Sequence, residues 1–511
     1  MSVQQVQVRQ GAYVDSARLM SVSRSMSQPD GVDWASAVMG TAANLETLQQ
    51  EGFEDASDAG ANDLVLAVRA ESEDSAEDAF AAAQDSLGGT TDEGGEREER
   101  RPRTLDEARD VVPDANVAIV SVPGAYAALE AHKALTAGLH VLLFSDHVSL
   151  DDELELKRRG EERGLFVMGP GAGTAVLGGV GLGFANAVER GSVGVVAGAG
   201  TGAQEVMTLL DRWGAGVSHL VGVGGRDLGV EVRGRMTRMA VRALAADPDT
   251  EALLLVSKPP DPDVAAEVLG DLGSMPAVAA LVGVGDDFSA PRGVRVASSM
   301  DEAVLEVLRL LDLSVPDPGA GLAERAAPEA DRLGQDRLAL RGLFSGGTMC
   351  YETMVVASRR LGPVYSNTPL QEDWGLPAPD GAHICLDVGE EEFTRDRPHP
   401  MIDVESRVEL IQREAGDPAT AVVLMDVVLG HGAHPDPAEV LAPACEEVTS
   451  QDDAPVVMAY VCGSDSDPQD REDQRRRLQE AGCVLAPTGA RAALLAAAIA
   501  AREPAIAEEA P

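Results

Sequence analysis

A strand–glycine–helix–strand pattern in residues 192–227 constrains the fold more than any other part of this sequence. A short apolar run, Val193–Val196, is followed by Gly198, Gly200 and Gly202, then by an amphipathic pattern from about Ala203. A second apolar run covers Leu220–Val223. This order predicts a βα unit of a parallel sheet. A glycine turn at a helix N-terminus presents free N–H groups and the positive end of the helix dipole, so the turn is a candidate anion site; the alternative is a tight βα connection without a ligand.

The same plan recurs near the C-terminus. An apolar run, Leu338–Phe344, leads into Ser345-Gly346-Gly347-Thr348 and a helical pattern. Residues 383–389, 417–430 and 455–463 match residues 220–227, 247–260 and 276–284 in the same order. Matching landmarks in a fixed order indicate an internal duplication. We therefore expect two helix N-termini that could face each other across one anion.

Composition shifts divide the rest of the chain. Residues 1–88 show the order βαβαβα, and residues 89–104 are a charged, glycine-rich linker. Residues 105–189 alternate short strands with helices, which predicts a parallel doubly wound sheet. Residues 190–312 and 337–500 form the duplicated domains, and residues 313–336, rich in Pro, Gly, Ala and acidic residues, form a second linker.

Charge and cysteine content exclude several classes of function. The net charge is −44, and Lys133, Lys157 and Lys258 are the three lysines of the chain. Abundant acid with so little lysine predicts a protein kept soluble in high salt, a halophilic cytoplasm. No basic patch suggests nucleic-acid binding. The five isolated cysteines indicate no disulfide framework. With no apolar run of membrane-spanning length, we expect a cytoplasmic protein that does not bind membranes.

The candidate site residues lie in turns that follow strands. The candidates for binding phosphate or substrate are Gly200, Thr201, Gly202, Gly225, Arg226, Asp227, Gly346, Gly347, Thr348, Arg397 and Asp403. The candidates for catalysis are Lys258, Asp387 and His399. Lys258 follows a strand in a chain that prefers arginine, although an exposed surface lysine is the alternative. Arg397 suits bidentate binding of a carboxylate or a phosphate.

A metal site is not expected. His431 and His434 are spaced like metal ligands, but they lie in a glycine-rich loop and zinc needs more partners.

Several segments resemble a known family. Gly169-Pro170, the pattern GxxGVVxxxGTGxxE from Gly191 to Glu205, and the glycine turn at 222–225 resemble the α-subunit of succinyl-CoA synthetases. The longer segments VMGTAANLETL (38–48), DRPHPMID (396–403) and VLMDVVLG (423–430) resemble the FdrA family of acyl-CoA-synthetase-like proteins. The resemblance implies an α/β protein with a CoA-binding-type Rossmann domain and two flavodoxin-like, ligase-type parallel-sheet domains.

CoA is a cofactor that the resemblance makes a candidate. The residues that would hold it lie in two turns at helix N-termini: Gly40, Thr41, Asn44, Pro123, Gly124 and Tyr126. An ordinary helix cap is the alternative for the first turn.

The chain departs from the synthetases where they carry a phosphorylated histidine. The corresponding loop has the sequence LVGVGDDFSAP (281–291), without histidine, and Ser257-Lys258 stands near the place of the glutamate that orients it. No ATP-grasp domain is visible. The FdrA resemblance instead implies one subunit of an oxamate carbamoyltransferase that acts with two companion subunits and converts oxalurate and phosphate to oxamate and carbamoyl phosphate. The alternatives are an acyl-CoA synthetase-like enzyme and a non-catalytic, metabolite-binding scaffold subunit.

The resemblance also suggests roles for the candidate residues. Phosphate or an oxyanion would be held by Gly200, Thr201, Gly346, Gly347 and Thr348. Arg226 or Arg397 would bind the substrate carboxylate, and His399 or Lys258 would transfer protons.

Overall fold

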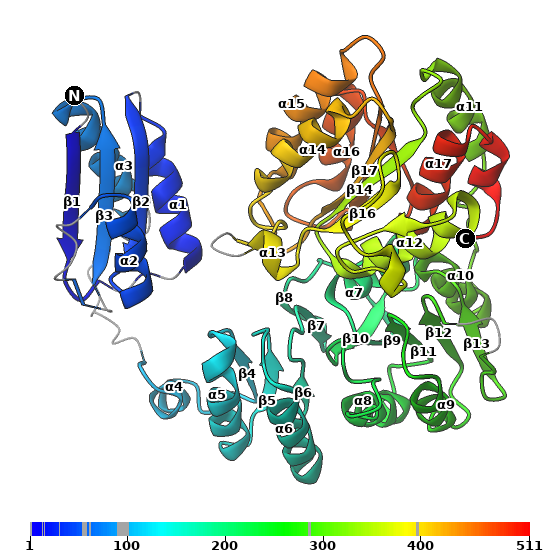
Figure 1. Cartoon of the computed structure of the whole chain (residues 1–511). Helices are drawn as coiled ribbons and strands as arrows, with labels where there is room; N and C mark the ends of the chain where they lie inside the picture. Colours follow the sequence, from blue (N-terminus) through cyan, green and yellow to red (C-terminus); the bar gives the residue numbers. More distant parts are fainter. Residues whose placement is uncertain are drawn as a thin grey trace. The chain divides into compact units, whose positions relative to one another are not determined.

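The computed structural model describes residues 3–12, 14, 16–29, 31–53, 59–60, 63–88, 102–284, 288–394 and 398–511. The chain forms two compact units, Met1–Arg101 and Pro102–Pro511 (Figure 1). Each unit is described by itself below.

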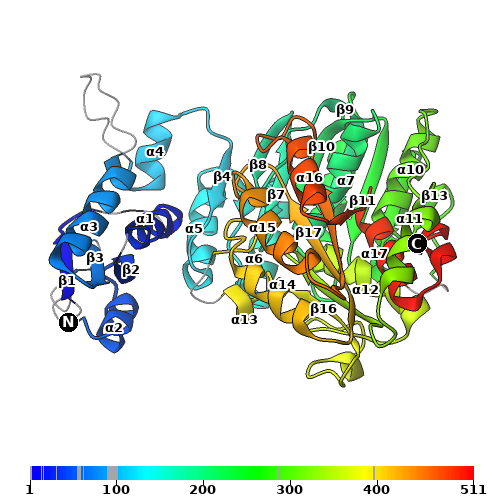
Figure 2. The same ribbon diagram turned by 90° about the horizontal axis from the view of Figure 1, so that it is seen from above.

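The N-terminal unit is a three-stranded antiparallel sheet with helices on both faces (Figure 2). Its elements are β1 (Val3–Arg9), α1 (Ser16–Ser27), β2 (Val32–Met39), α2 (Ala42–Gln50), β3 (Leu64–Ala70) and α3 (Glu73–Gly88). β3 lies between β1 and β2 and pairs antiparallel with both. Leu66 and Val68 of β3 pack against α1 and α3, whereas Val65 and Ala67 pack against α2. Because both faces are covered, β3 is apolar from Leu64 to Val68.

The second unit begins with a small parallel sheet in the order β4-β5-β6. Its elements are α4 (Leu105–Val111), β4 (Val117–Val120), α5 (Gly124–Thr136), β5 (His140–Leu143), α6 (Leu150–Arg163) and β6 (Val167–Met168). The strands lie in chain order, so strand order never reverses within this sheet. In a doubly wound sheet the ligand crevice lies where the strand order reverses, so these three strands alone do not form a ligand crevice.

A seven-stranded sheet follows, in the order β13-β12-β11-β9-β10-β7-β8. Its elements are β7 (Thr174–Leu177), β8 (Val180–Gly183), β9 (Arg190–Ala197), α7 (Gly200–Arg212), β10 (Val217–Gly222), α8 (Arg235–Ala246), β11 (Ala252–Ser257), α9 (Pro262–Gly270), β12 (Ala277–Leu281), β13 (Val294–Ala297) and α10 (Met300–Leu310). The five strands β9–β13 are parallel, and β7 and β8 add an antiparallel hairpin at one edge. This hairpin precedes the expected domain start at residue 190 but belongs to the same sheet.

The third sheet of this unit is parallel throughout, in the order β15-β16-β14-β17-β18-β19. Its strands are β14 (Ala339–Phe344), β15 (Val364–Tyr365), β16 (His383–Asp387), β17 (Thr420–Val428), β18 (Val456–Cys462) and β19 (Val484–Leu485). Its helices are α12 (Gly347–Leu361), α13 (Glu391–Thr394), α14 (Ser406–Gly416), α15 (Pro437–Thr449), α16 (Arg471–Glu480) and α17 (Gly489–Ala501), with short 3₁₀ helices at Glu372–Trp374 and Pro504–Glu508.

The two large sheets share one topology. If the strands are numbered from the one before the glycine turn, and the two-residue edge strand β15 is left out, β10-β9-β11-β12-β13 and β16-β14-β17-β18-β19 both have the order 2-1-3-4-5. This is the flavodoxin-like order, in which ligands bind next to the first strand. The predicted duplication and the predicted α/β class with flavodoxin-like parallel sheets are confirmed.

Four helices join the two halves. α7 and α10 from the first half and α12 and α17 from the second contribute to one apolar core with both sheets. Strand β11 shows how this follows from the sequence: Leu254 and Val256 enter that core, whereas Leu253 and Leu255 pack toward α8 and α9. The segment predicted as a linker, 313–336, contains helix α11 (Leu322–Arg332), whose Leu322, Ala326 and Ala330 are buried. In the part of the chain that the structure describes, no helix is both long and apolar enough to cross a membrane.

Candidate active site between two helix N-termini

Helices α7 and α12 both begin without a capping side chain. Their N-cap residues are Ala199 and Gly346, and neither makes a side-chain hydrogen bond to the first turn. By contrast, α9, α10 and α17 are capped by Asp261, Ser299 and Thr488. The first amide groups of α7 and α12 therefore remain available to a ligand, with the positive ends of both helix dipoles behind them.

The two helix N-termini lie against each other. A Cβ atom added at Gly202 would lie 2.8 Å from Thr348 Cγ2, and one added at Gly346 would collide with the Thr201 side chain. This close approach requires glycine at both positions. The predicted juxtaposition of the two helix N-termini is confirmed.

An open cleft of about 670 Å³ lies at this junction. It brings together predicted residues from both halves of the duplication: Gly200, Thr201, Gly225, Arg226, Lys258, Gly346, Gly347, Thr348, Asp387 and His399. Segments separated by nearly 200 residues thus meet in one site, because every turn follows the carboxyl end of a parallel strand.

Lys258 and Asp387 both lie next to Gly347. A Cβ atom at Gly347 would lie 2.5 Å from Lys258 Nζ and would also collide with Asp387 Oδ2. Among the residues that the structure describes, the Lys258 ammonium donates no hydrogen bond, and it interacts electrostatically with Asp387. Burial raises the pKa of Asp387 to about 6, while Lys258 opposes the shift. A carboxyl group with a pKa near neutrality is suited to proton transfer.

His399 is a neutral hydrogen-bond donor in this geometry. Its Nδ1 accepts the N–H of Met401 at 3.3 Å, which leaves the proton on Nε2. Burial lowers the pKa of His399 to about 4, so the ring is uncharged at neutral pH. The ring lies 5.9 Å from that of Phe184, which also lines the cleft.

Arg226 lies at the edge of the cleft, where a buried carboxylate fixes it. Its Nε pairs with Glu153 Oε2 at 2.7 Å, and its Nη2 donates to the Val148 carbonyl at 2.8 Å. Half of its side chain is exposed, so the guanidinium can still receive an anionic group.

Asp227 does not belong to the cleft, which corrects the prediction that it binds substrate. Its carboxylate is fully buried and pairs with Lys157 at 2.7 Å. It also accepts the N–H and hydroxyl of Thr237 in the first turn of α8. Asp227 therefore holds a helix and a buried ammonium in place, and it is not available to a ligand.

Other predicted residues lie elsewhere. Gly202 packs against Thr348 and does not line the cleft. Asp403 is half-buried and also does not line it. Arg397 lies outside the described residues.

The first of the two predicted cofactor turns is an ordinary helix cap. Thr41 is the N-cap of α2 and accepts the Asn44 N–H at 3.4 Å, while the Asn44 side chain donates to the Met39 carbonyl at 2.8 Å. Gly40 lies so close to the Gly60 carbonyl that a Cβ atom would approach it to 2.5 Å. The turn thus uses its polar groups internally.

The second predicted turn begins α5. Pro123 is the N-cap without a side-chain bond, and Tyr126 is exposed. Gly124 packs against the backbone of Asp146 and His147, whose carbonyl oxygens occupy that flank of the turn.

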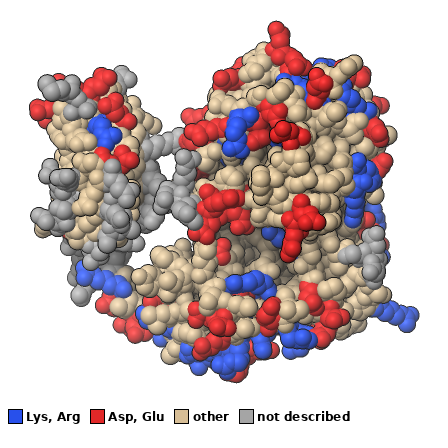
Figure 3. Space-filling model, viewed as in Figure 1, with Lys and Arg blue, Asp and Glu red and all other residues tan. Residues whose placement is uncertain are grey.

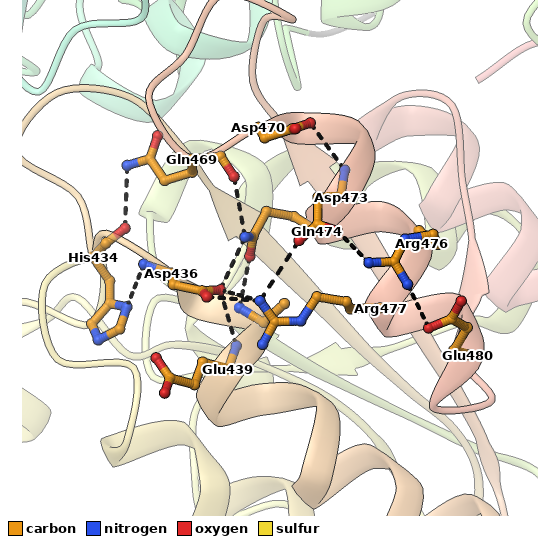
Figure 4. A network of polar contacts seen from close by, with 11 residues as sticks. His434, Asp436, Glu439, Gln469, Asp470, Asp473, Gln474, Arg476, Arg477 and Glu480 are labelled. Carbon is orange, nitrogen blue, oxygen red and sulfur yellow. Dashed lines mark hydrogen bonds and ion pairs between the residues drawn. The ribbon is translucent and has the colours of Figure 1, made fainter.

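His434 is used structurally (Figure 4). Its Nδ1 accepts the N–H of Asp436 at 3.1 Å, and its carbonyl accepts the Gln469 amide at 3.2 Å. Asp436 caps α15 and pairs with Arg477 at 2.7 Å. These contacts fix the loop after β17, and His434 does not line the cleft.

Gln204 is a cleft residue that the sequence prediction missed. It lies on α7, three residues after Thr201 and on the same face of the helix, and only 1% of its surface is exposed. A comparison of GTGAQE (200–205) with GTMCYE (347–352) would have found it, because Gln204 replaces the Tyr351 of the second copy.

Comparisons with known proteins agree with this architecture. Residues 343–499 match the CoA-ligase family model, and residues 1–102 match the model of the AllF heavy metal-associated domain. The chain is 37% identical to the uncharacterized protein YahF of Escherichia coli K12, over 97% of this chain and 98% of YahF. It is 31% identical to subunit alpha 2 of the ADP-forming succinate–CoA ligase of Archaeoglobus fulgidus, over 36% of this chain and 63% of that subunit.

The fold, the duplicated sheets and these matches define a protein of the acyl-CoA-ligase-like class, in the succinyl-CoA synthetase superfamily. Within that class the chain belongs to the FdrA-like family that includes YahF.

The residues of the N-terminal unit do not fit a heavy-metal site. Soft metals select thiolate, thioether and imidazole ligands; residues 1–102 contain neither cysteine nor histidine, and Met26 and Met39 are buried in the apolar core. Among the described residues, no group of three or more His, Cys, Asp or Glu side chains is placed to hold a metal ion. The N-terminal unit therefore matches the family model of a heavy metal-associated domain but lacks the cysteine and histidine side chains that would bind such a metal.

Proposed function

We propose that this protein is a subunit of an oxamate carbamoyltransferase, which uses phosphate to convert oxalurate to oxamate and carbamoyl phosphate. The observation that carries the proposal is the pair of uncapped helix N-termini beside the Lys258 ammonium. Helix N-termini and a cation favour phosphate and a developing oxyanion. The surface of this strongly acidic chain disfavours anions, with carboxylates spread among the basic groups on the face drawn in Figure 3. Anion binding therefore depends on the cleft.

In the proposed reaction, four residues of the cleft have distinct roles. A phosphate oxygen attacks the ureido carbonyl carbon, the bond from that carbon to the inner nitrogen breaks, and the proton lost by phosphate is gained by that nitrogen. Asp387, with its pKa of about 6, carries this proton. Lys258 and the N–H on His399 Nε2 stabilise the oxyanion on the carbonyl, and Arg226 binds the oxalurate carboxylate.

Two features favour this reaction over nucleotide-dependent ligation. The sequence has no histidine in the loop 281–291, where the synthetases carry their phosphorylated residue, and no ATP-grasp domain. Lys258 stands near the place where the synthetases have a glutamate, so this position carries a positive charge instead of a negative one. A cation there suits direct attack by a phosphate anion.

The test is co-expression with two candidate companion subunits and an assay for carbamoyl phosphate formed from oxalurate and phosphate. Carbamate kinase and ADP convert the product to ATP, which gives a continuous signal. The same complex with Lys258→Met is the control for background phosphorolysis. A folded complex that forms no carbamoyl phosphate contradicts the proposal.

A second candidate, an acyl-CoA-ligase-like enzyme, is favoured by the match to succinate–CoA ligase subunits. His399 is the histidine that lines the cleft among the described residues. Phosphorylation of His399, detected by mass spectrometry after incubation with ATP, CoA and an organic acid, would support this alternative.

A further inference from the structure

The orientation of the Gln204 side-chain amide can be derived from the groups around it. Asp467 accepts the N–H groups of Ala187 and Ser464, each at 2.8 Å, so its carboxylate acts as an acceptor. Asn186 donates its Nδ2 to Asp467 Oδ2 at 2.7 Å and to the Leu429 carbonyl at 3.0 Å. The Asn186 Oδ1 is therefore an acceptor that needs a donor.

Gln204 supplies that donor. Its Nε2 donates to Asn186 Oδ1 at 3.2 Å and to the Leu429 carbonyl at 3.3 Å. Both N–H bonds of the amide are thereby used, and the carbonyl oxygen must point the other way. Among the described residues no donor reaches Gln204 Oε1, and this oxygen is not sealed from solvent. Because Gln204 lines the cleft and its Nε2 is turned toward Asn186 and Leu429, we infer that Oε1 faces the cleft.

The cleft contains donors that suit an anion and titratable carboxylates such as Asp387 and Glu390, and Gln204 adds an uncharged acceptor with a fixed orientation. Helix amide groups, Lys258 and Arg226 all donate, and they suit a phosphate or a carboxylate. A carbonyl oxygen repels such anions and attracts an N–H group. Because Asn186 and Leu429 hold the amide from behind, it cannot turn to present its NH₂ group without losing two hydrogen bonds.

We propose that Gln204 Oε1 accepts a hydrogen bond from the NH₂ group of a carbamoyl substrate, so that the cleft selects a carbamoyl group over an acetyl group. This inference rests on the proposed function and names the feature of the substrate that the site recognises. An acetyl group of the same shape places a methyl group against the oxygen and leaves it buried without a partner. Sites that hydrogen-bond an N–H group discriminate strongly against analogues that lack it.

Carbamoyl phosphate and acetyl phosphate form a matched pair of probes, because they differ by NH₂ and CH₃. Binding of each to the full chain with its companion subunits is measured by titration calorimetry. We expect wild-type protein to bind carbamoyl phosphate about tenfold more tightly, the effect of one hydrogen bond of ordinary strength. In Gln204→Met the ratio should fall to about one, which corresponds to the loss of that hydrogen bond.

Two further variants separate recognition from structure. Gln204→Glu keeps an acceptor oxygen, so both affinities should fall through charge repulsion while the ratio persists. Tyr351→Met changes the equivalent position on α12, which does not line the cleft, and should leave the ratio unchanged. If the role of Gln204 were merely structural, Gln204→Met would lower the affinities for carbamoyl phosphate and acetyl phosphate equally.

The outcomes distinguish this inference from the proposed reaction. Equal affinity of wild-type protein for the two phosphates, or a ratio that survives Gln204→Met, overturns the role of Gln204 even if oxalurate is cleaved. A Gln204-dependent preference without cleavage of oxalurate supports the role of Gln204 and contradicts the reaction. Absence of binding by either phosphate contradicts both.

Discussion

The N-termini of α7 and α12 have the same backbone and opposite surroundings. Both begin Gly-Thr, both lack a capping side chain, and both meet in one cleft. After β10 the chain carries Arg226, whereas after β16 the equivalent residue is Glu390. After β11 it carries Lys258, whereas the matching residue of β17 is Val428. The first half therefore supplies cations and the second half supplies carboxylates.

The space at the two helix N-termini differs as well. A Cβ atom on Gly200 would meet only Thr174 Oγ1, at 3.9 Å, whereas one on Gly347 would meet Lys258 and Asp387. The α7 end is thus open and the α12 end is covered by titratable groups. Two helix N-termini with the same topology thus have different surroundings, and under the proposed function the α7 end binds the anion while the α12 end serves proton transfer.

The largest effect should come from removing the proton carrier of the α12 end. Asp387→Asn should lower the rate of carbamoyl phosphate formation by about 100-fold or more, the usual contribution of general acid–base catalysis. The wild-type rate should rise with pH through about 6 as Asp387 ionises, and the variant should lose this dependence. Rates measured from pH 5 to 8 check both; an unchanged pH profile would exclude Asp387 as the proton carrier.

The same variant should be more stable than the wild type at neutral pH. The folded-state pKa of about 6 exceeds the ordinary aspartate pKa of 3.8, so the contribution of Asp387 to stability is full below pH 3.8 and is lost as pH rises through 6. This difference between the folded and the unfolded pKa of Asp387 corresponds to about 3 kcal/mol. Urea unfolding at pH 4 and pH 7 measures the difference. A stabilised but slow variant identifies a group retained for function.

Loss of the cation at the junction should be nearly as costly for activity. Lys258→Met removes the ammonium beside Gly347, and the rate should fall by about 100-fold, as for other single oxyanion-stabilising groups. Lys258→Arg keeps the charge and should recover part of the rate. Because Lys258 donates no hydrogen bond among the described residues and interacts electrostatically with Asp387, the melting temperature should barely change at pH 5, where Asp387 is mostly protonated. A normal rate in Lys258→Met would place the anion away from the α12 end.

The same substitution at two equivalent glycines tests the difference in space directly. Gly347→Ala inserts a methyl group against Lys258 and Asp387 and should reduce the rate by about tenfold or more, with a loss of about 1–3 kcal/mol of stability from crowding. Gly200→Ala meets open space and should keep the stability or raise it, since alanine favours the helix by about 0.5–1 kcal/mol. Assays and thermal unfolding of both variants side by side provide the comparison. Equal losses would show that the two ends are equivalent.

The sequence predicts the parts of this site that depend on local pattern. Glycine turns after strands locate Gly200 and Thr348, and strand ends in a parallel sheet locate Lys258 and Asp387. Asp227 follows a strand in the same way, but Lys157, seventy residues earlier, draws its carboxylate into the interior. Gln204 resembles any polar helix residue until the contacts with Asn186 and Leu429 fix its amide. Contacts between distant segments determine both the burial of Asp227 and the orientation of Gln204, and a local sequence pattern cannot predict such contacts.

The smallest effect concerns two buried glutamates that connect the halves. Glu205 of α7 accepts the N–H of Gly489 at the start of α17, and Glu352 of α12 accepts the N–H of Met300 at the start of α10. Burial raises the pKa of both. Helix α7 of the first half therefore caps α17 of the second half, and α12 of the second half caps α10 of the first half.

The two caps differ in how many oxygens they use. Glu205 also accepts the Tyr460 hydroxyl with its second oxygen, so Glu205→Gln leaves that hydroxyl facing an NH₂ group and should cost about 1 kcal/mol. Among the described residues Glu352 accepts one hydrogen bond, and Glu352→Gln keeps that bond while removing a buried ionisable group, so stability should stay within about 0.5 kcal/mol or rise. Urea unfolding of both variants at pH 7 measures the difference. If Glu352→Gln were the more destabilising variant, the Glu352 carboxylate would have to carry a charge that the surrounding protein stabilises. The two halves would then differ in their shared core as well as in the cleft.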